Sequence, residues 1–421
     1  MKEYRFNKYI EREYILPNGL KIHYFPYPEY HTTYMGFVIP YGSNMCEYKI
    51  NGRKVKSGIA HFLEHRMFDS ENGDMIRKFA SLGAICNAYT YYDRTCYYFQ
   101  TIHDPFEAFK VLCELVFNFH STRDKVINER SIIVEEMLGG LEDPRDELNK
   151  MMQHKLIVKD GLKYPIIGTK KDIISTTLKD LKEAYNAFYD IKDMYLIVVG
   201  PYPIEPIIDY ISTNYKENKN HNYVIEKIDY NDEFKKCNHR KVVIERIAQN
   251  DTQSLKFKIN IKPLIDKYGR NYFDTIIEYA LSLLFDVGSD FNESFNNLYV
   301  IYNSLSYSYY DCEGIGILSV FYIAKKSIRQ NKLIFDGLNN PKKYISSRNL
   351  ELYARKMYGK KLVFLQETDS LFQNTTIDIK DDSFILESIA KENKVLLDDI
   401  EYVLKYFGTC DYIKGVMKAK E

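Results

Sequence analysis

The sequence predicts an α+β fold made of two homologous α/β repeats, each a mixed or antiparallel sheet with helices packed on it. First, short β-branched and aromatic runs alternate with amphipathic helical segments along 421 residues, too many for one ordinary core. Second, residues 213–240 are polar and charged, with few core positions. Third, residues 178–189 resemble residues 396–407. A segment repeated on either side of a polar stretch indicates two related halves.

The first half of the chain shows clear strand and helix signals. The turn Pro17-Asn18-Gly19 separates two strands, Gly83 ends a helix, and the aromatic run after it breaks at Tyr92-Asp93-Arg94, which is typical of a hairpin. The predicted strands are residues 14–16, 20–25, 33–40, 84–101 (as a hairpin) and 194–200, and the predicted helices are residues 57–68, 73–82, about 104–119, 123–142 and 178–190.

The second half begins with a strand, Lys241 to Glu245, directly after the polar stretch. Each repeat would close with the segment that the two halves share. We therefore predict a first domain at residues 1–218, a linker at residues 219–238 and a second domain at residues 239–421.

Composition excludes several classes of protein. Lys and Arg total 58, as do Asp and Glu, so the basic excess of a nucleic-acid binder is missing. No apolar run reaches the length of a membrane helix, and the first residues show no secretory signal. The seven cysteines form no C-x-x-C pair. This usage indicates reduced thiols in a cytoplasmic protein, and argues against a cysteine-based structural zinc site.

The predicted helix at residues 57–68 carries the motif His61-Phe62-Leu63-Glu64-His65. Residues four apart share a helix face, so both imidazoles can reach one point, and Glu64 lies beside them. Two histidines suit Zn²⁺, and a carboxylate next to a zinc-bound water can take its proton before the attack on a peptide carbonyl. The alternative is an amphipathic helix whose histidines only pack or face solvent.

A catalytic zinc site needs a third ligand, and the predicted helix at residues 123–142 offers three glutamates. Glu129 and Glu136 are seven residues apart, so they point the same way, on a face that borders apolar residues. A buried carboxylate is costly unless it is paired or binds metal. This favours Glu136 as the ligand and Glu129 as a residue that holds a ligand in place. Glu135 points elsewhere, and an ordinary surface carboxylate is the alternative for Glu129.

At these residues the chain resembles the M16 family of pitrilysin-like, or inverzincin, zinc metallopeptidases. Residues 58–68 and 132–137 are close to the family's signatures, and Tyr164 to Thr169 also matches a family segment. The resemblance implies zinc as cofactor, His61, His65 and Glu136 as its ligands, Glu64 as the base and Glu129 as the supporting glutamate. The stretch from Cys86 to Thr90 matches the edge strand that holds the substrate backbone, which implies substrate contacts from Asn87, Ala88 and Thr90.

The length resembles that of the short-chain M16 subfamily, which includes YmfH-like proteins and paired bacterial processing peptidases. The resemblance implies that the chain forms half of a clamshell chamber built from two such subunits. Family members also use an Arg/Tyr pair. Here Tyr307 matches the tyrosine and is a candidate catalytic residue, but Val300 stands where the arginine is expected. We therefore expect a homologous partner subunit to supply the pair, or otherwise a homodimer.

These features predict a zinc endopeptidase subunit that cleaves small unfolded peptides or peptide precursors inside a dimeric chamber. Neither nucleic-acid binding nor membrane insertion is expected. The alternative is a catalytically incomplete or structural M16-like subunit that binds peptide or a partner without cutting. The complete motif argues against this alternative, because a scaffold has no need of all four zinc-site residues.

Overall fold

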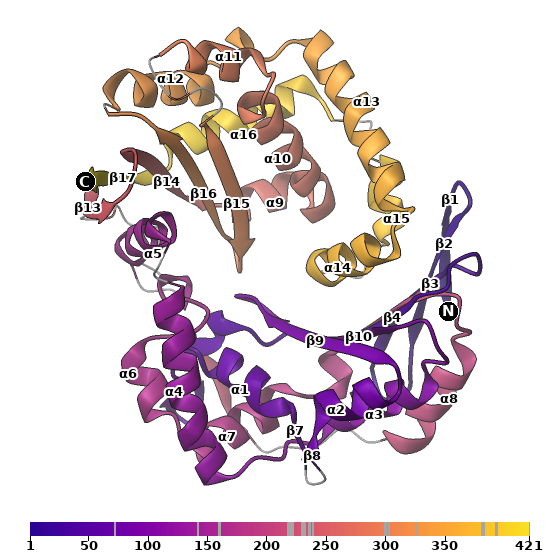
Figure 1. Ribbon diagram of the computed structural model, residues 1–421. Helices are drawn as coiled ribbons and strands as arrows, with labels where there is room; N and C mark the ends of the chain where they lie inside the picture. The colour runs from indigo at the N-terminus through magenta and orange to yellow at the C-terminus, as the bar shows by residue number, and fades with distance from the viewer. Residues whose placement is uncertain are drawn as a thin grey trace. The chain divides into compact units, whose positions relative to one another are not determined.

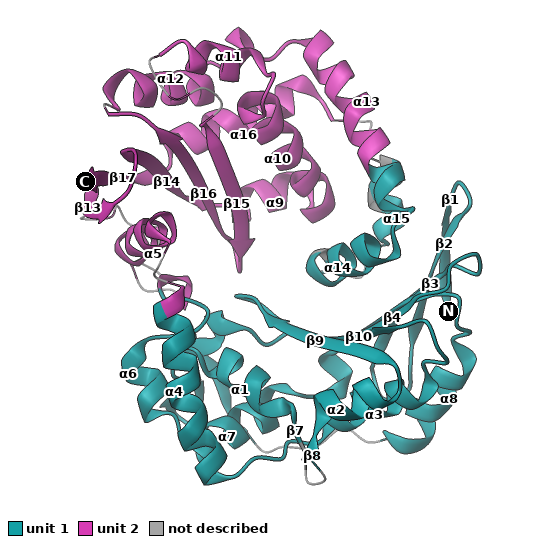
Figure 2. Cartoon of the chain, in the orientation of Figure 1, with its two compact units in different colours: residues 1–138, 164–229, 361–390 teal, residues 139–163, 230–360, 391–421 magenta. Residues whose placement is uncertain are grey.

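The computed structural model describes residues 1–70, 73–140, 143–158, 161–216, 223–228, 233–234, 237, 240–298, 301, 304–325, 327–379, 384–391 and 395–420. The chain forms two compact units that interleave along the sequence (Figures 1 and 2). Unit 1 contains residues 1–138, 164–229 and 361–390, and unit 2 contains residues 139–163, 230–360 and 391–421.

Unit 1 is built on a sheet with the strand order β1-β2-β3-β11-β4-β10-β9. Strands β3 and β11 are parallel, and the other neighbouring strands are antiparallel. The strands are β1 (Lys2–Phe6), β2 (Tyr9–Ile15), β3 (Lys21–Pro26), β4 (Thr33–Ile39), β9 (Ala84–Thr90), β10 (Thr95–Thr101) and β11 (Tyr195–Gly200). Five short strands pair outside it: β5 (Tyr48–Ile50), β6 (Arg53–Lys54), β7 (Asp69–Ser70), β8 (Gly73–Asp74) and β12 (Ile225–Lys227).

Helices cover both faces of this sheet (Figure 1). The larger apolar core lies between the strands and α1 (Ile59–Met67), α2 (Met75–Ser81), α3 (Phe106–Phe117), α4 (Arg123–Gly139), α6 (Lys170–Ser175), α7 (Leu178–Phe188) and α8 (Glu205–Asn214). The opposite face is covered by α14 (Thr368–Asp378) and α15 (Ile385–Lys391), through a second core that includes Tyr34, Leu371 and Phe372. Strand β9, at the end of the sheet order, pairs only with β10 among the described strands.

Unit 2 repeats this plan on a sheet with the strand order β13-β17-β14-β16-β15. Its strands are β13 (Lys241–Ile247), β14 (Thr252–Asn260), β15 (Ser306–Cys312), β16 (Ile315–Ile323) and β17 (Asp411–Lys420). One face carries α9 (Lys262–Tyr268), α10 (Arg270–Phe285), α11 (Asp290–Asn296), α12 (Ile328–Asn339) and α16 (Leu397–Thr409), and α5 (Pro144–Leu156) packs on the other face. A further helix, α13 (Ser347–Phe364), runs from unit 2 residues into unit 1 residues.

The predicted α+β fold with two repeats is confirmed by the sheets. Without β1 and β2, the strands of unit 1 follow the order first-fifth-second-fourth-third along the chain, and the strands of unit 2 follow the same order. In both units only the first and fifth strands are parallel. The two similar segments found in the sequence form α7 and α16, each of which precedes the last strand of its sheet.

The compact units do not follow the predicted domain limits 1–218 and 239–421. Residues 139–163 group with unit 2 and residues 361–390 with unit 1, because each segment buries apolar side chains on a sheet of the other repeat. The limits 1–218 and 239–421 remain a prediction of where each sequence repeat begins and ends. Much of the predicted linker at residues 219–238 lies outside the described residues. In the part of the chain that the structure describes, we find no helix with the length and apolarity needed to span a membrane.

Candidate active site

The helix with the two histidines begins at a tight contact between two loops. Gly58 precedes α1 with a φ of 80°, a left-handed conformation that glycine adopts without strain. A Cβ atom on Gly58 would lie 2.3 Å from the carbonyl oxygen of Ile167, and one on Gly168 would lie 2.6 Å from the carbonyl oxygen of Ser57. The segment from Tyr164 to Thr169 therefore fixes where α1 starts, and with it the positions of the side chains on α1.

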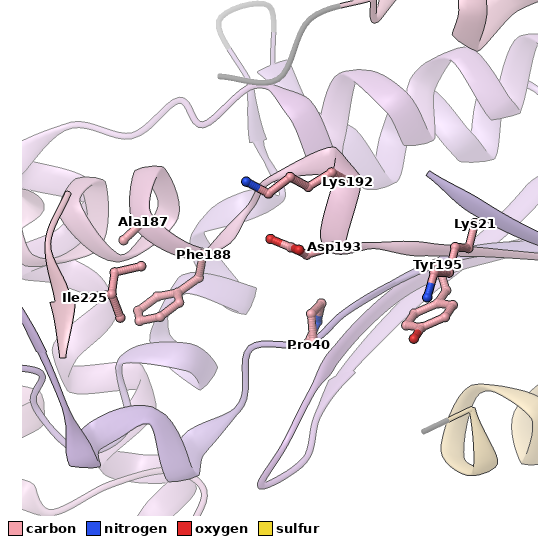
Figure 3. Close-up of a pocket in the computed structure, with 8 residues that line it drawn as sticks. All are labelled: Lys21, Pro40, Ala187, Phe188, Lys192, Asp193, Tyr195 and Ile225. Carbon is pink, nitrogen blue, oxygen red and sulfur yellow. The ribbon is translucent and has the colours of Figure 1, made fainter. Parts of the chain in front are cut away.

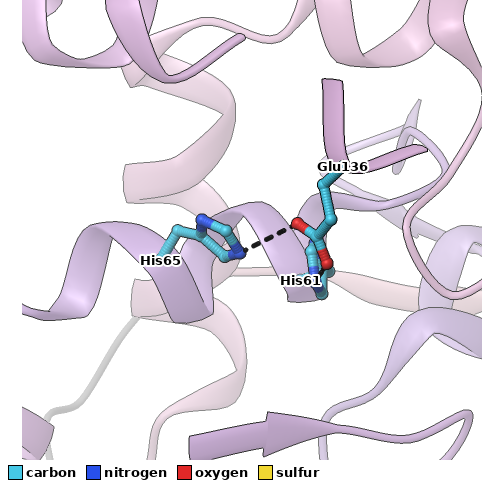
Figure 4. Close-up of side chains that lie close together, drawn as sticks. All are labelled: His61, His65 and Glu136. Atoms are coloured by element: carbon cyan, nitrogen blue, oxygen red, sulfur yellow. Dashed lines mark ion pairs between the residues drawn. The ribbon is translucent and has the colours of Figure 1, made fainter. Parts of the chain in front are cut away.

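Three side chains converge as the sequence predicts (Figure 4). The Nε2 atoms of His61 and His65 each lie 3.5 Å from a carboxylate oxygen of Glu136. One ligand atom from each of the three residues lies within 4.8 Å of the others. Two imidazoles and one carboxylate are a donor set that suits zinc with a fourth position left for water. The residues present therefore fit the metal that the motif predicts.

Glu129 holds one of these histidines in place. Its Oε1 lies 2.9 Å from Nδ1 of His65, and its Oε2 accepts a hydrogen bond from Arg66, which also pairs with Asp69. Since a carboxylate only accepts, Nδ1 of His65 donates this hydrogen bond, and in the neutral imidazole the lone pair is then on Nε2, where it can bind a metal. Glu129 is buried, with 8% of its surface exposed, whereas Glu136 is exposed.

The charges of this cluster shift the pKa values of its members. Burial lowers the pKa of His65, but the hydrogen bond to Glu129 and the nearby carboxylates outweigh it, so the net shift is upward. The hydrogen bond to His65 lowers the pKa of Glu129, with help from Arg66. The hydrogen bond to His61 lowers the pKa of Glu136. Each carboxylate is thereby favoured in the ionised form that binds metal or holds a ligand.

Glu64 lies on α1 between the two histidines and is half-buried. Its Oε2 accepts a hydrogen bond of 2.6 Å from the hydroxyl of Thr90, at the end of β9. This places the predicted base next to the strand that is predicted to bind substrate. The hydroxyl of Thr90 is therefore engaged with Glu64.

The other two predicted substrate contacts lie farther along β9. Asn87 is exposed, and its side-chain oxygen accepts a hydrogen bond of 2.8 Å from the backbone N–H of Ala88. This bond engages the backbone N–H of Ala88. Strand β9 is an edge strand among the described strands, and an edge strand can pair with an extended peptide.

Tyr307 lies on β15 and belongs to unit 2, whereas the other predicted site residues belong to unit 1. Its hydroxyl is 2.9 Å from Oδ1 of Asp286 and 3.0 Å from the hydroxyl of Ser282. Burial raises the pKa of Tyr307 well above its ordinary value. The aligned position of the missing arginine, Val300, lies outside the described residues.

A pocket in unit 1 lies near the start of β11 and contains none of the predicted site residues (Figure 3). Lys192, Asp193 and Tyr195 line it, and burial raises the pKa of Asp193. Its lining includes no histidine or cysteine. The predicted site residues on α1, α4, β9 and β15 therefore all lie outside the lining of this pocket.

Comparison with known proteins finds a family match over the part of the chain that carries this site. Residues 27–170 match the family described as Insulinase (Peptidase family M16). Over these residues the chain is similar to the M16 peptidases. It is similar to the "Uncharacterized zinc protease YmfH" of Bacillus subtilis, with 30% identity over 203 residues, and this match covers 47% of each chain. The chain thus matches about half the length of that curated relative. The family match over residues 27–170 includes all the predicted zinc ligands.

Solved structures show that the M16-like fold extends over the rest of the chain. A protein from Alicyclobacillus acidocaldarius described as an M16-like peptidase has a TM-score of 0.88 at 22% identity, covering 99% of this chain and 100% of its own. A protein from Pseudomonas fluorescens described as a peptidase M16 inactive domain has a TM-score of 0.76 at 12% identity, covering 98% of both chains. At these identities the likeness shows the fold alone.

Sequence reasoning on this M16 relative missed the partners that hold the site together. Arg66 directly follows His65, but nothing in its local pattern shows that it pairs with Glu129. The bond from Thr90 to Glu64 joins residues that are 26 positions apart. The edge-strand motif contains Thr90 and marks it as a substrate contact, but the motif does not show the bond to Glu64.

Proposed function

We propose that this chain is a zinc-dependent endopeptidase subunit that cleaves small unfolded peptides or peptide precursors. The convergence of His61, His65 and Glu136 carries the proposal, because these ligand atoms lie within 4.8 Å of one another and Glu64 stands on the same helix. The curated relatives are named zinc proteases, which supports the same chemistry. A cytoplasmic location is part of the proposal, supported by seven free cysteines.

Each side chain has a defined task in this reaction. His61, His65 and Glu136 hold zinc, and Glu129 keeps His65 in the tautomer whose Nε2 can bind it. Zinc, when bound, lowers the pKa of water and polarises a peptide carbonyl. Glu64 accepts the proton of the attacking water and passes it to the leaving amine. The base needs a carboxylate oxygen that no other donor occupies, and Glu64 has Oε1 available besides the Oε2 bonded to Thr90.

The substrate would bind as an added strand on β9. Backbone pairing selects extended, unfolded peptide, since a folded segment has its own backbone groups already paired. Asn87 and Ala88 would make the backbone contacts, and Thr90 joins them to the base. An experiment with one sequence in extended and in disulfide-closed form tests this step: we expect cleavage of the extended form only.

A homologous M16-like subunit would complete the chamber in this proposal. It would supply the Arg/Tyr pair, because Val300 stands at the arginine position of this chain and the hydroxyl of Tyr307 is bonded to Asp286 and Ser282. If no such partner exists, a homodimer is the alternative. Co-purification from native cells with mass spectrometry of the partner decides between the two arrangements.

A second candidate function is peptide or partner binding without cleavage. One observation favours it: a solved neighbour with the same fold is described as an inactive domain. Metal content separates the two functions. An active peptidase purified without chelator should hold close to one zinc per chain, because three ligands with a held histidine bind zinc tightly. Less than about a tenth of an equivalent would favour the binding function.

The decisive variant is Glu64→Gln, which keeps the shape of the side chain and removes the base. We expect at least a 100-fold loss of kcat with the zinc content unchanged, since general-base catalysis contributes about 10²- to 10⁴-fold. Glu135→Gln is the matched control, because Glu135 is an exposed glutamate of α4 next to the ligand Glu136. Assays use a library of internally quenched fluorogenic peptides, with any co-purified partner present. Wild-type cleavage by Glu64→Gln would show that Glu64 is not the base.

A further inference from the structure

We propose that Thr90 is a positioning residue for Glu64 rather than a substrate contact. The hydroxyl of Thr90 lies 2.6 Å from Oε2 of Glu64, and only 9% of the residue's surface is exposed. A hydrogen bond to an ionised acceptor is shorter and stronger than a neutral one. The bond therefore holds the carboxylate of a half-buried glutamate in one orientation. This inference rests on the proposed function, because it takes Glu64 as the base.

The neighbouring hydroxyl leaves the proton of Thr90 free for this bond. Thr95 is the cross-strand partner of Thr90, and the two hydroxyl oxygens are 3.5 Å apart. Thr95 is fully buried and donates its own proton to the backbone carbonyl of Tyr41 at 2.8 Å. A hydroxyl has one proton to donate. Thr90 therefore gives its proton to Glu64, the much closer acceptor.

The bond also decides which carboxylate oxygen serves the reaction. With Oε2 of Glu64 occupied by Thr90, Oε1 is the oxygen that takes the proton from water. A base must be held within a fraction of an ångström of its productive position, and a misplacement of about 1 Å can cost about 100-fold in rate. Thr90 lies on β9 and restrains the carboxylate of Glu64, which lies on α1, through this hydrogen bond.

The position of Thr90 on β9 links the base to substrate binding. Ala88 precedes it by two residues, so both side chains lie on the same face of the strand, while Asn87 points to the other face. A peptide paired with β9 and the carboxylate of Glu64 are thus placed by one rigid strand, which pairs with β10 along its full length. The position of the scissile bond relative to the carboxylate of Glu64 is therefore fixed by this strand.

Two substitutions of Thr90 test the proposal. Thr90→Val keeps the shape and removes the hydroxyl, and we expect kcat to fall about 10- to 100-fold with KM within twofold and zinc content unchanged. Thr90→Ser keeps the hydroxyl and should stay within about threefold of wild type. Thr101→Val is the matched control: Thr101 is a buried threonine of β10 whose hydroxyl donates to Gly83, and its loss should leave kcat unchanged.

Three kinetic results would overturn the proposal. A wild-type kcat in Thr90→Val would show that the bond is not needed. A rise in KM alone would make Thr90 a substrate contact. Equal losses in Thr90→Val and Thr90→Ser would mean that packing, not the hydroxyl, matters.

A crystal structure of zinc-loaded Thr90→Val gives a readout that needs no activity. We expect the carboxylate of Glu64 to leave its wild-type position in this variant and to keep it in Thr90→Ser. An unmoved carboxylate in Thr90→Val would overturn the proposal. If the zinc-loaded wild type cuts no peptide but Thr90→Val still displaces Glu64, the proposed function fails while the positioning role stands.

Discussion

Two buried charged residues, Glu129 in unit 1 and Lys256 in unit 2, have opposite surroundings. Glu129 meets two complementary partners, Arg66 and His65, which lower its pKa. Lys256 on β14 is fully buried and donates to a neutral oxygen of Gln153 at 3.1 Å, so burial lowers its pKa to about 7. The comparison teaches that a buried charge marks a site only where opposite charges and metal ligands converge on it.

Loss of Glu129 should have the larger effect. Glu129→Gln removes the charge that holds His65 and leaves Arg66 with one fewer partner in a buried place. We expect zinc affinity to fall about 10- to 100-fold, as for other residues that orient a metal ligand. Competition with a fluorescent zinc chelator measures the change. Glu135→Gln, on the same helix, should bind zinc like wild type, and an unchanged affinity in Glu129→Gln would show that His65 needs no support.

Replacement of Lys256 should change stability and leave zinc binding unaffected. Lys256→Met fills the same buried space without a charge, so we expect the free energy of unfolding at pH 7 to rise by about 1 kcal/mol or more. Below pH 7 the lysine is charged in both the folded and the unfolded state, so the full free-energy cost of burying the charged ammonium is present there. The cost shrinks as the pH rises from about 7 toward the ordinary value of 10.5, and the advantage of Lys256→Met shrinks with it.

Lys258 provides the matched control for this prediction. It lies two residues along β14, on the same face, but its ammonium pairs with a carboxylate oxygen of Glu233 at 3.0 Å. Lys258→Met removes one member of a buried ion pair and should lower stability by about 3 kcal/mol. Urea unfolding at pH 7 and pH 9.5 measures both variants. Lower stability of Lys256→Met at pH 7 would mean that the buried ammonium stabilises unit 2.

Local spacing explains what the sequence could predict. His61 and His65 are one helical turn apart, so their convergence follows from helix geometry alone. The hairpin of β9 and β10 follows from its aromatic and β-branched residues and from the break at Tyr92-Asp93-Arg94. Strand β1 was missed because its short, charged run from Lys2 to Phe6 is mostly exposed and lacks an apolar face. Elements with a clear hydrophobic periodicity can be predicted from the sequence. A short exposed strand such as β1 forms because it pairs with the neighbouring strand β2.

Contacts between distant residues explain what the sequence could not predict. The sequences of α5 and α14 do not say which sheet each helix covers, and both pack on the sheet of the other repeat. Arg94 is an example of such a distant contact. Its side chain donates to the backbone carbonyls of Thr376 and Ile377 at the end of α14. No pattern near Arg94 indicates this partner, 282 residues away.

Tyr307 extends the comparison to a neutral polar group in unit 2 and should show the smallest effect. Its hydroxyl already bonds to Asp286 and Ser282, so Tyr307→Phe should lower the free energy of unfolding by about 1 to 2 kcal/mol, as expected for a bond to a charged acceptor. Because these bonds occupy the hydroxyl, we expect kcat/KM to change less than about threefold. Ser282→Ala removes one of the two partners and is the control. A loss of tenfold or more in kcat for Tyr307→Phe, with Ser282→Ala unaffected, would instead assign the hydroxyl to the reaction.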